Sequence, residues 1–186
     1  MSLRIAVVVG SLRRESLNRQ LAEALVRLAP AGFEFHFPRI DDLPLYTQDD
    51  DTQQAETVQR FKNEIAQSQG VIFVTPEYNR SIPGVLKNAI DHGSRPYGKG
   101  VWAGKAAAVT GISIGPMGTA MAQQHLRNIL AFLDMSVMGQ PEAYLQNKPG
   151  LLAGNGEVGI PESKEFLQKW MERFCALVQL RVAMQS

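Results

Sequence analysis

A segment near the start of the chain has the residues of an anion-binding loop. An apolar run at 5–9 ends at Gly10, a polar loop follows, and a helical pattern begins behind Ser16. Loops of this kind bind anions, because unpaired backbone N–H groups and the positive end of the helix dipole face them. The side chains that could bind the anion are those of Ser11, Ser16, Asn18, Arg13, Arg14 and Arg19.

This loop favours a terminal monophosphate over a dinucleotide. It lacks the G-x-G-x-x-G pattern that lets a pyrophosphate approach bare backbone. Among its arginines we expect Arg13 to meet the phosphate, whereas Arg14 and Arg19 fit solvated surface positions. Ser16 fits the N-cap of the helix, and capping is compatible with a phosphate contact.

Two further segments carry residues suited to a flat heterocycle. Residues 75–84 read Thr-Pro-Glu-Tyr-Asn-Arg-Ser-Ile-Pro-Gly, with a proline near each end to stiffen the backbone. We expect its N–H groups to face the ligand, that of Glu77 more than the carboxylate. Tyr78 would contact the ring or, alternatively, a second subunit. In residues 111–118, glycines allow close approach of a planar ligand, and Ser113 could hydrogen-bond its polar edge.

The stretch 111–115 also matches G-x-S-x-G, the nucleophile turn of serine hydrolases. Such an enzyme needs an acid and then a histidine after the serine. Only His125 follows Ser113, no acid lies between them, and His125 falls within the next helical pattern. The order of these residues therefore argues against a serine hydrolase. The histidines and the single cysteine also lack the spacing of a metal site.

The elements that must position these segments alternate between apolar strands and amphipathic helices. We expect strands at 5–9, 33–37, 71–75, 106–111 and 135–138, and helices at 17–28, 57–67, 83–91, 118–133 and 162–182. Residues 139–160 are rich in Gly and Pro and are expected to be irregular. The alternation predicts a three-layer α/β fold with a doubly wound, five-stranded parallel sheet. The flavodoxin-like strand order 2-1-3-4-5 places the loops at 10–18, 75–83 and 111–118 at one end of the sheet.

Composition limits the classes of function. The 186 residues fit one domain spanning 1–186, and the net charge of +1, with scattered basic residues, argues against a nucleic-acid partner. Cys175 lies in an apolar helical pattern, so we expect a buried thiol and a reducing compartment. No apolar run approaches the length of a membrane span and no signal segment is evident. We therefore expect a cytoplasmic protein with no membrane partner.

The sequence resembles the NAD(P)H-dependent FMN reductase family, in particular its chromate, quinone and azo-dye reductases. The resemblance extends to about residue 147 and rests on the 10–18 loop, on the block at 75–91 and on the loop with Ser113. It implies a flavodoxin-like fold, bound FMN, and NADPH or NADH as the reductant. The residues that it assigns to FMN are Ser11, Arg13, Ser16, Leu17, Asn18, Pro76, Glu77, Tyr78, Asn79, Arg80 and Ser113.

The resemblance also implies a flavin-centred reaction without a catalytic side chain. Hydride from NAD(P)H would pass to FMN and then, by a ping-pong mechanism, to a quinone, chromate, an azo compound or free flavin. Arg80 or Arg95 could meet the 2′-phosphate of NADPH. One alternative is an electron-transfer flavodoxin without NAD(P)H turnover, although such proteins are commonly acidic and this chain is not. Another is a flavin-binding regulator.

Members of this family form homo-oligomers, so the resemblance implies a homo-oligomer for this chain. A dimer is expected, with the flavin near the subunit interface, and a tetramer is common in the family. Met121 and Gln124 stand where some relatives carry Arg and Tyr in a tetramer contact. That departure weakens the expectation of a tetramer more than that of a dimer.

Overall fold

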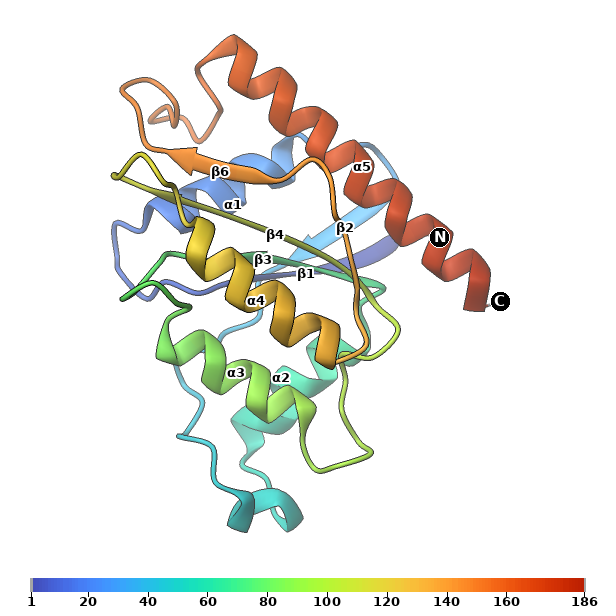
Figure 1. Cartoon of the computed structure of the whole chain (residues 1–186). Coiled ribbons are helices and arrows are strands. Elements are labelled where there is room, and N and C mark those ends of the chain that lie inside the picture. The colour runs from blue at the N-terminus through green and yellow to red at the C-terminus, as the bar shows by residue number, and fades with distance from the viewer. Residues whose placement is uncertain (1, 186) are drawn as a thin grey trace.

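The computed structural model describes residues 2–185, which fold around a parallel β-sheet (Figure 1). Its strands are β1 (Leu3–Val9), β2 (Phe33–His36), β3 (Gly70–Val74), β4 (Ala106–Ser113), β5 (Ser136–Val137) and β6 (Ala143–Gln146). The strand order is β2-β1-β3-β4-β5, and all pairings are parallel. β3 and nearly all of β4 are buried, because consecutive apolar residues suit strands covered on both faces.

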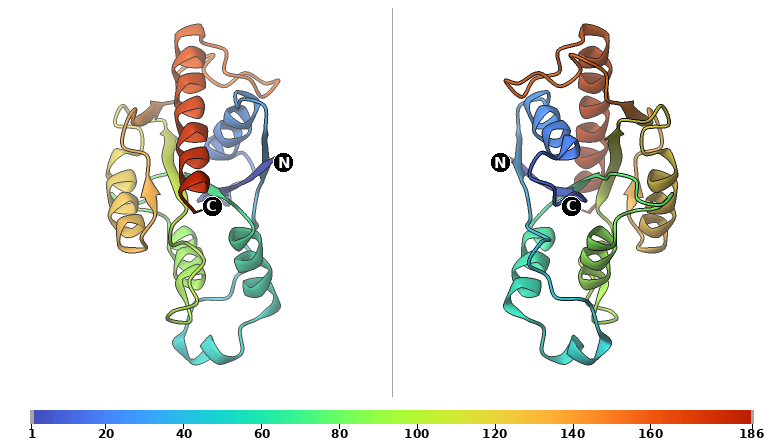
Figure 2. Two further views of the ribbon diagram at one scale, coloured as in Figure 1. Left: turned by 90° about the vertical axis from the view of Figure 1, so that its right-hand side faces the viewer. Right: turned by 90° about the vertical axis from the view of Figure 1, so that its left-hand side faces the viewer.

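Helices cover both faces of the sheet and give three layers (Figure 2). They are α1 (Leu17–Arg27), α2 (Glu56–Ala66), α3 (Gly84–Ser94), α4 (Ala120–Phe132) and α5 (Pro161–Gln185), with the 3-10 helix η1 (Gln48–Thr52). One core packs α1 and α5 on the sheet through residues such as Leu21 and Trp170. The other core packs α2, α3 and α4 through residues such as Phe61, Leu86 and Leu126.

The predicted α/β class and the strand order 2-1-3-4-5 are confirmed, but the sheet within residues 2–185 has six strands where five were predicted. β5 pairs with the first residues of β4, whereas β6 pairs with Thr110–Ser113. The segment 139–160, expected to be irregular, therefore contributes a strand. It does so because β4 extends two residues beyond its predicted end, and those residues require a partner.

The long C-terminal helix is amphipathic. Cys175 lies on its buried face and is 2% exposed, as the sequence predicted. None of the helices within residues 2–185 is long and apolar enough to cross a membrane.

Candidate active site

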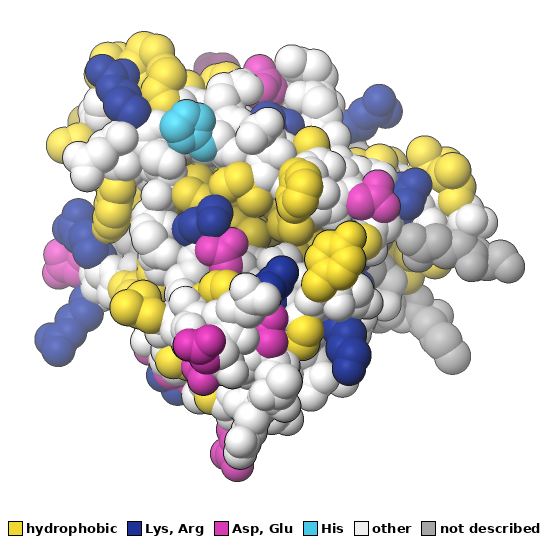
Figure 3. Space-filling view, turned by 60° about the horizontal axis from the view of Figure 1, so that its bottom comes forward, with side chains coloured by type: hydrophobic (Ala, Val, Ile, Leu, Met, Phe, Trp, Pro, Cys, Tyr) yellow, Lys and Arg dark blue, Asp and Glu magenta, His cyan; other side chains and the backbone are white. Residues whose placement is uncertain are grey.

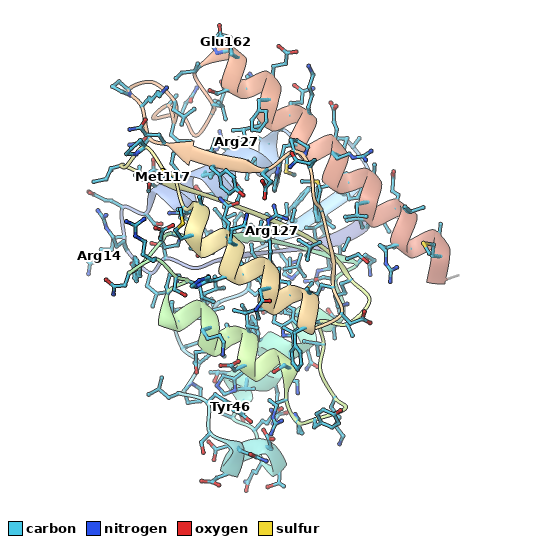
Figure 4. All side chains as sticks on the ribbon, viewed as in Figure 1. Arg14, Arg27, Tyr46, Met117, Arg127 and Glu162 are labelled. Atoms are coloured by element: carbon cyan, nitrogen blue, oxygen red, sulfur yellow. The ribbon has the colours of Figure 1, made fainter. Side chains whose placement is uncertain are left out.

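Three loops leave the same end of the sheet, which faces the viewer in the right-hand panel of Figure 2. They follow β1, β3 and β4, as predicted. Gly10 N donates to Val74 O (2.9 Å) and Thr75 N donates to Thr110 O (3.0 Å), so the backbones stay paired as they leave the sheet. Arg14 of the first loop and Met117 of the third both project at this end (Figure 4). Ligands of doubly wound sheets bind at such an end.

The first loop carries a row of free backbone donors. The N–H groups of residues 11–16 donate to no other atom of residues 2–185. Ser16 caps α1, because its Oγ accepts from Arg19 N at 3.1 Å, and its side chain is buried. Ser11 and Leu17 are half-buried at the two ends of this segment. Free donors beside the positive end of a helix fit the predicted phosphate.

Asn18 has a different environment from the one that we expected. Its side chain is 4% exposed, and its carboxamide makes two hydrogen bonds with the backbone of Ile112, each 3.0 Å long. Both amide heteroatoms are thus engaged in joining α1 to β4. A direct contact of the Asn18 side chain with a ligand stays a prediction, whereas its role in positioning the first loop is visible.

The arginines of this region differ in their partners. Arg19 pairs with Glu23 (2.6 Å), and its guanidinium lies 4.1 Å from the centroid of the Phe37 ring. Arg13 and Arg14 are exposed and make no hydrogen bond or ion pair with another described side chain. Only Arg13 of these two lines a cavity of about 280 Å³ beside Ser11. Arg19 lines the same cavity, and the choice of Arg13 as the phosphate ligand stays a prediction.

The second loop forms a tight two-residue turn. Tyr78 and Ser81 exchange backbone hydrogen bonds of 2.9 and 3.0 Å. Asn79 and Arg80 between them have φ values of 51° and 66°, the left-handed pair of a type I′ turn. The N–H groups of Asn79 and Arg80 donate to no described atom, and Tyr78 is 48% exposed. The turn can therefore offer donors and a ring face to a ligand.

The carboxylate of Glu77 makes contacts that the sequence did not indicate. Oε2 accepts from the backbone N–H groups of Met121 (3.0 Å) and Ala122 (3.2 Å), in the first turn of α4. The side chain does not extend into solvent. The Glu77 N–H donates to no atom of the described chain, which keeps the predicted backbone role open.

The third loop is closed by its own serine. The Ser113 hydroxyl lies 2.5 Å from Gly118 O and 3.2 Å from Gly115 O, so it stabilises the conformation of this loop. Gly111 packs against the second loop, where a Cβ atom would lie 2.1 Å from Thr75 O. The contact of Ser113 with a ligand's polar edge stays a prediction.

The geometry also argues against the hydrolase. His125 Nδ1 lies 3.0 Å from Ser81 Oγ, and no histidine among residues 2–185 contacts Ser113. A nucleophile needs a base within hydrogen-bond reach.

Arg95, one candidate for binding the 2′-phosphate of NADPH, already has partners within the chain. Arg95 Nε donates to the hydroxyl of Tyr46 (2.8 Å), and the guanidinium pairs with Asp51 (3.3 Å). These contacts fasten the 44–51 segment onto the end of α3. Arg80 is exposed in the turn after β3, so its side chain is free to bind the 2′-phosphate as predicted.

Comparisons with known proteins identify the family of this chain. The family described as NADPH-dependent FMN reductase matches residues 3–150. The 2-hydroxy-1,4-benzoquinone reductase of a Burkholderia species is 50% identical over 181 residues, which cover 97% of this chain and 99% of that protein. A quinone reductase of Pseudomonas putida is 48% identical over 180 residues, 96% of each chain.

A solved structure is also similar to this chain over nearly its whole length. The flavoenzyme NAD(P)H:(acceptor) oxidoreductase FerB from Paracoccus denitrificans superposes with a TM-score of 0.93 and 43% identity, over 96% of this chain and 98% of that one. The expected enzyme class, with FMN and NAD(P)H as cofactors, is thereby confirmed. The chain belongs to the NADPH-dependent FMN reductase family.

Proposed function

We propose that this chain binds FMN across the three loops and reduces quinones with NAD(P)H. The observation that carries the proposal is the row of free N–H groups at residues 11–16, beside the N-terminus of α1 and Arg13. This arrangement suits a terminal phosphate, which FMN carries at the end of its ribityl chain. Ser11 and Ser16 border the row and would complete the phosphate site.

The second and third loops would hold the isoalloxazine ring. Free N–H groups of Asn79 and Arg80, and that of Glu77, can donate to the acceptors on the ring edge. Pro76 restricts the entry to this turn, and Tyr78 presents an exposed ring for contact. Donors at the pyrimidine edge favour the reduced, anionic ring.

When bound, FMN would supply the hydride-transfer chemistry between NAD(P)H and the acceptor. No side chain then has to act as an acid or a base. Residues 78–80 and Ile114 and Met117 are exposed, so the site is open on one side. NAD(P)H and the acceptor would use this one open side in turn, which predicts ping-pong kinetics.

Quinones are the acceptors that we propose first, because two relatives that match nearly the whole chain are named quinone reductases. Chromate, azo compounds and free flavin are further proposals that rest on the family resemblance. A cytoplasmic location stays a prediction from the sequence.

We also propose that the chain is a homodimer. A groove of about 600 Å³ lies between the start of α3 and α4, with Ile82 and Ile129 among its lining residues. Hydrophobic side chains are visible among the polar ones when this side is turned forward (Figure 3). The groove borders Ser81, next to the turn that would hold the ring. A tetramer has less support. Gln124, at the position of the family's tetramer contact, donates a hydrogen bond to the Tyr144 hydroxyl of its own chain (2.9 Å).

The test is a steady-state assay on protein loaded with FMN and freed of excess flavin. NADPH or NADH and 1,4-benzoquinone are varied together, and the oligomer size is measured by light scattering. The proposal predicts parallel lines in double-reciprocal plots. Protein that fails to retain FMN would refute it. Protein that retains FMN without oxidising NAD(P)H would refute the reductase and favour an electron-transfer flavodoxin or a flavin-binding regulator.

A further inference from the structure

The N-terminus of α4 is capped by a residue from another part of the chain. Thr119, at the N-cap position, makes no side-chain capping bond. Its hydroxyl accepts instead from Gln123 Nε2 at 3.0 Å. The donors of the first turn are satisfied by Glu77 Oε2, which accepts from Met121 N and Ala122 N. A carboxylate at this place also neutralises the positive end of the helix dipole.

A second contact joins the Tyr78–Ser81 turn, which follows Glu77, to α4. Ser81 Oγ lies 3.0 Å from Nδ1 of His125, which stands one helical turn after Met121. Glu77 precedes the Tyr78–Ser81 turn and Ser81 ends it, so α4 holds the turn at both of its ends. Between these two points the turn contains no glycine, although Asn79 and Arg80 both adopt positive φ. Such a backbone persists when its surroundings fix it.

We propose that Glu77 is a positioning residue for flavin binding, acting through its carboxylate and α4. By holding the turn against the helix, it places the free N–H groups of Asn79 and Arg80 where the ring would lie. The negative charge of Glu77 also offsets the positive N-terminal end of α4 that the ring would otherwise experience. This inference rests on the proposed function, since the turn's donors need a flavin to bind.

Three variants separate these effects. Glu77→Ala removes the cap and releases the turn, so the Kd for FMN should rise about tenfold or more, the loss expected for charge-assisted hydrogen bonds. Glu77→Gln keeps a carbonyl oxygen that can accept from both N–H groups, so the Kd should rise less than about threefold. Glu165→Gln is the matched control, because Glu165 is an exposed carboxylate paired only with Lys169 on α5. It should leave the Kd unchanged.

The midpoint potential of the bound flavin gives a readout that a purely structural cap would not move. Glu77→Gln keeps the capping oxygen but removes the negative charge that offsets the positive end of α4, and this loss favours the anionic reduced ring. Its potential should therefore be more positive than that of the wild type, whereas that of Glu165→Gln should not change. Amide hydrogen exchange in the FMN-free protein should be faster at residues 121 and 122 in Glu77→Ala only.

The experiment measures FMN affinity by fluorescence quenching, the flavin potential, and amide exchange for the four proteins. A wild-type Kd and potential in both Glu77 variants would overturn the positioning role while leaving the proposed function intact. A wild type that does not bind FMN would overturn both. If Glu77→Ala does not fold, Glu77→Gln still decides, since an unchanged potential in that variant contradicts the proposal.

Discussion

The side-chain amide of Asn18 pairs with the backbone of Ile112 through two hydrogen bonds, one donated and one accepted, each 3.0 Å long. Asn18 lies in the first turn of α1, and Ile112 lies near the end of β4. The pair therefore joins the loop that would hold a phosphate to the loop that carries Ser113. Both residues are buried, so these two hydrogen bonds lie away from solvent.

Replacing Asn18 with alanine should destabilise the fold. The change leaves a buried N–H and a buried carbonyl of Ile112 without partners, which costs about 2–4 kcal/mol of unfolding free energy. Urea denaturation of the FMN-free protein measures this loss. Gln20→Ala, at an exposed position of the same helix, is the control and should change stability by less than about 0.5 kcal/mol. Equal stability of the two variants would contradict the positioning role.

Arg13 and Arg14 provide a second matched pair. Both are exposed and lie in the loop after β1, but only Arg13 lines the cavity beside Ser11. Arg13→Ala should raise the Kd for FMN about tenfold to a hundredfold, as expected for the loss of a charge-assisted bond to phosphate. Arg14→Ala should raise it less than about threefold. Equal effects in a flavin-fluorescence titration would mean that the phosphate ligand is wrongly assigned.

Gly111 and Gly115 test why the third loop contains glycines. At Gly111 an added Cβ would lie 2.1 Å from Thr75 O and 2.3 Å from Thr119 Oγ1. At Gly115 the only neighbour within 4 Å is Ser113 Oγ, at 3.9 Å. Gly111→Ala should therefore lower the unfolding free energy by about 3 kcal/mol or more, and Gly115→Ala by less than about 1 kcal/mol. Similar melting temperatures would show that the two loops are not in close contact.

Most of the fold could be predicted from local patterns. The apolar runs of β1, β3 and β4 and the helical stripes between them required a parallel sheet with its loops at one end. β6 could not be predicted, because Ala143–Gln146 is too short to show a period. The strand forms because the end of β4 needs a partner. The Gly/Pro-rich segment around β6 also indicated an irregular structure rather than a strand.

The site was predictable at the level of loops rather than of atoms. The cap at Ser16 and the buried thiol of Cys175 follow from local sequence. The contacts of Asn18 and Glu77 do not, because each partner lies more than forty residues away. Thr119 is a residue type suited to an N-cap, yet its side chain makes no capping bond, so local sequence does not reveal the cap by Glu77.

The buried thiol predicts how stability depends on pH. Burial raises the pKa of Cys175 from 9.0 to about 12. The folded state therefore keeps the thiol neutral, and its stabilising contribution is complete below about pH 9 and is lost as the pH rises towards 12. Between pH 7 and pH 10 the wild type should lose about 1.4 kcal/mol of unfolding free energy more than Cys175→Ala does. Chemical denaturation at both pH values measures the difference, and parallel losses would contradict the assignment.

We expect FMN bound across the three loops to be reduced by NAD(P)H and reoxidised by a quinone. The most direct measurement is an anaerobic titration of the FMN-loaded protein, followed by flavin absorbance. One equivalent of NADPH or NADH should bleach the flavin, and one equivalent of 1,4-benzoquinone should then restore its spectrum without further nucleotide. A flavin that stays oxidised when both nucleotides are added in excess would contradict the account.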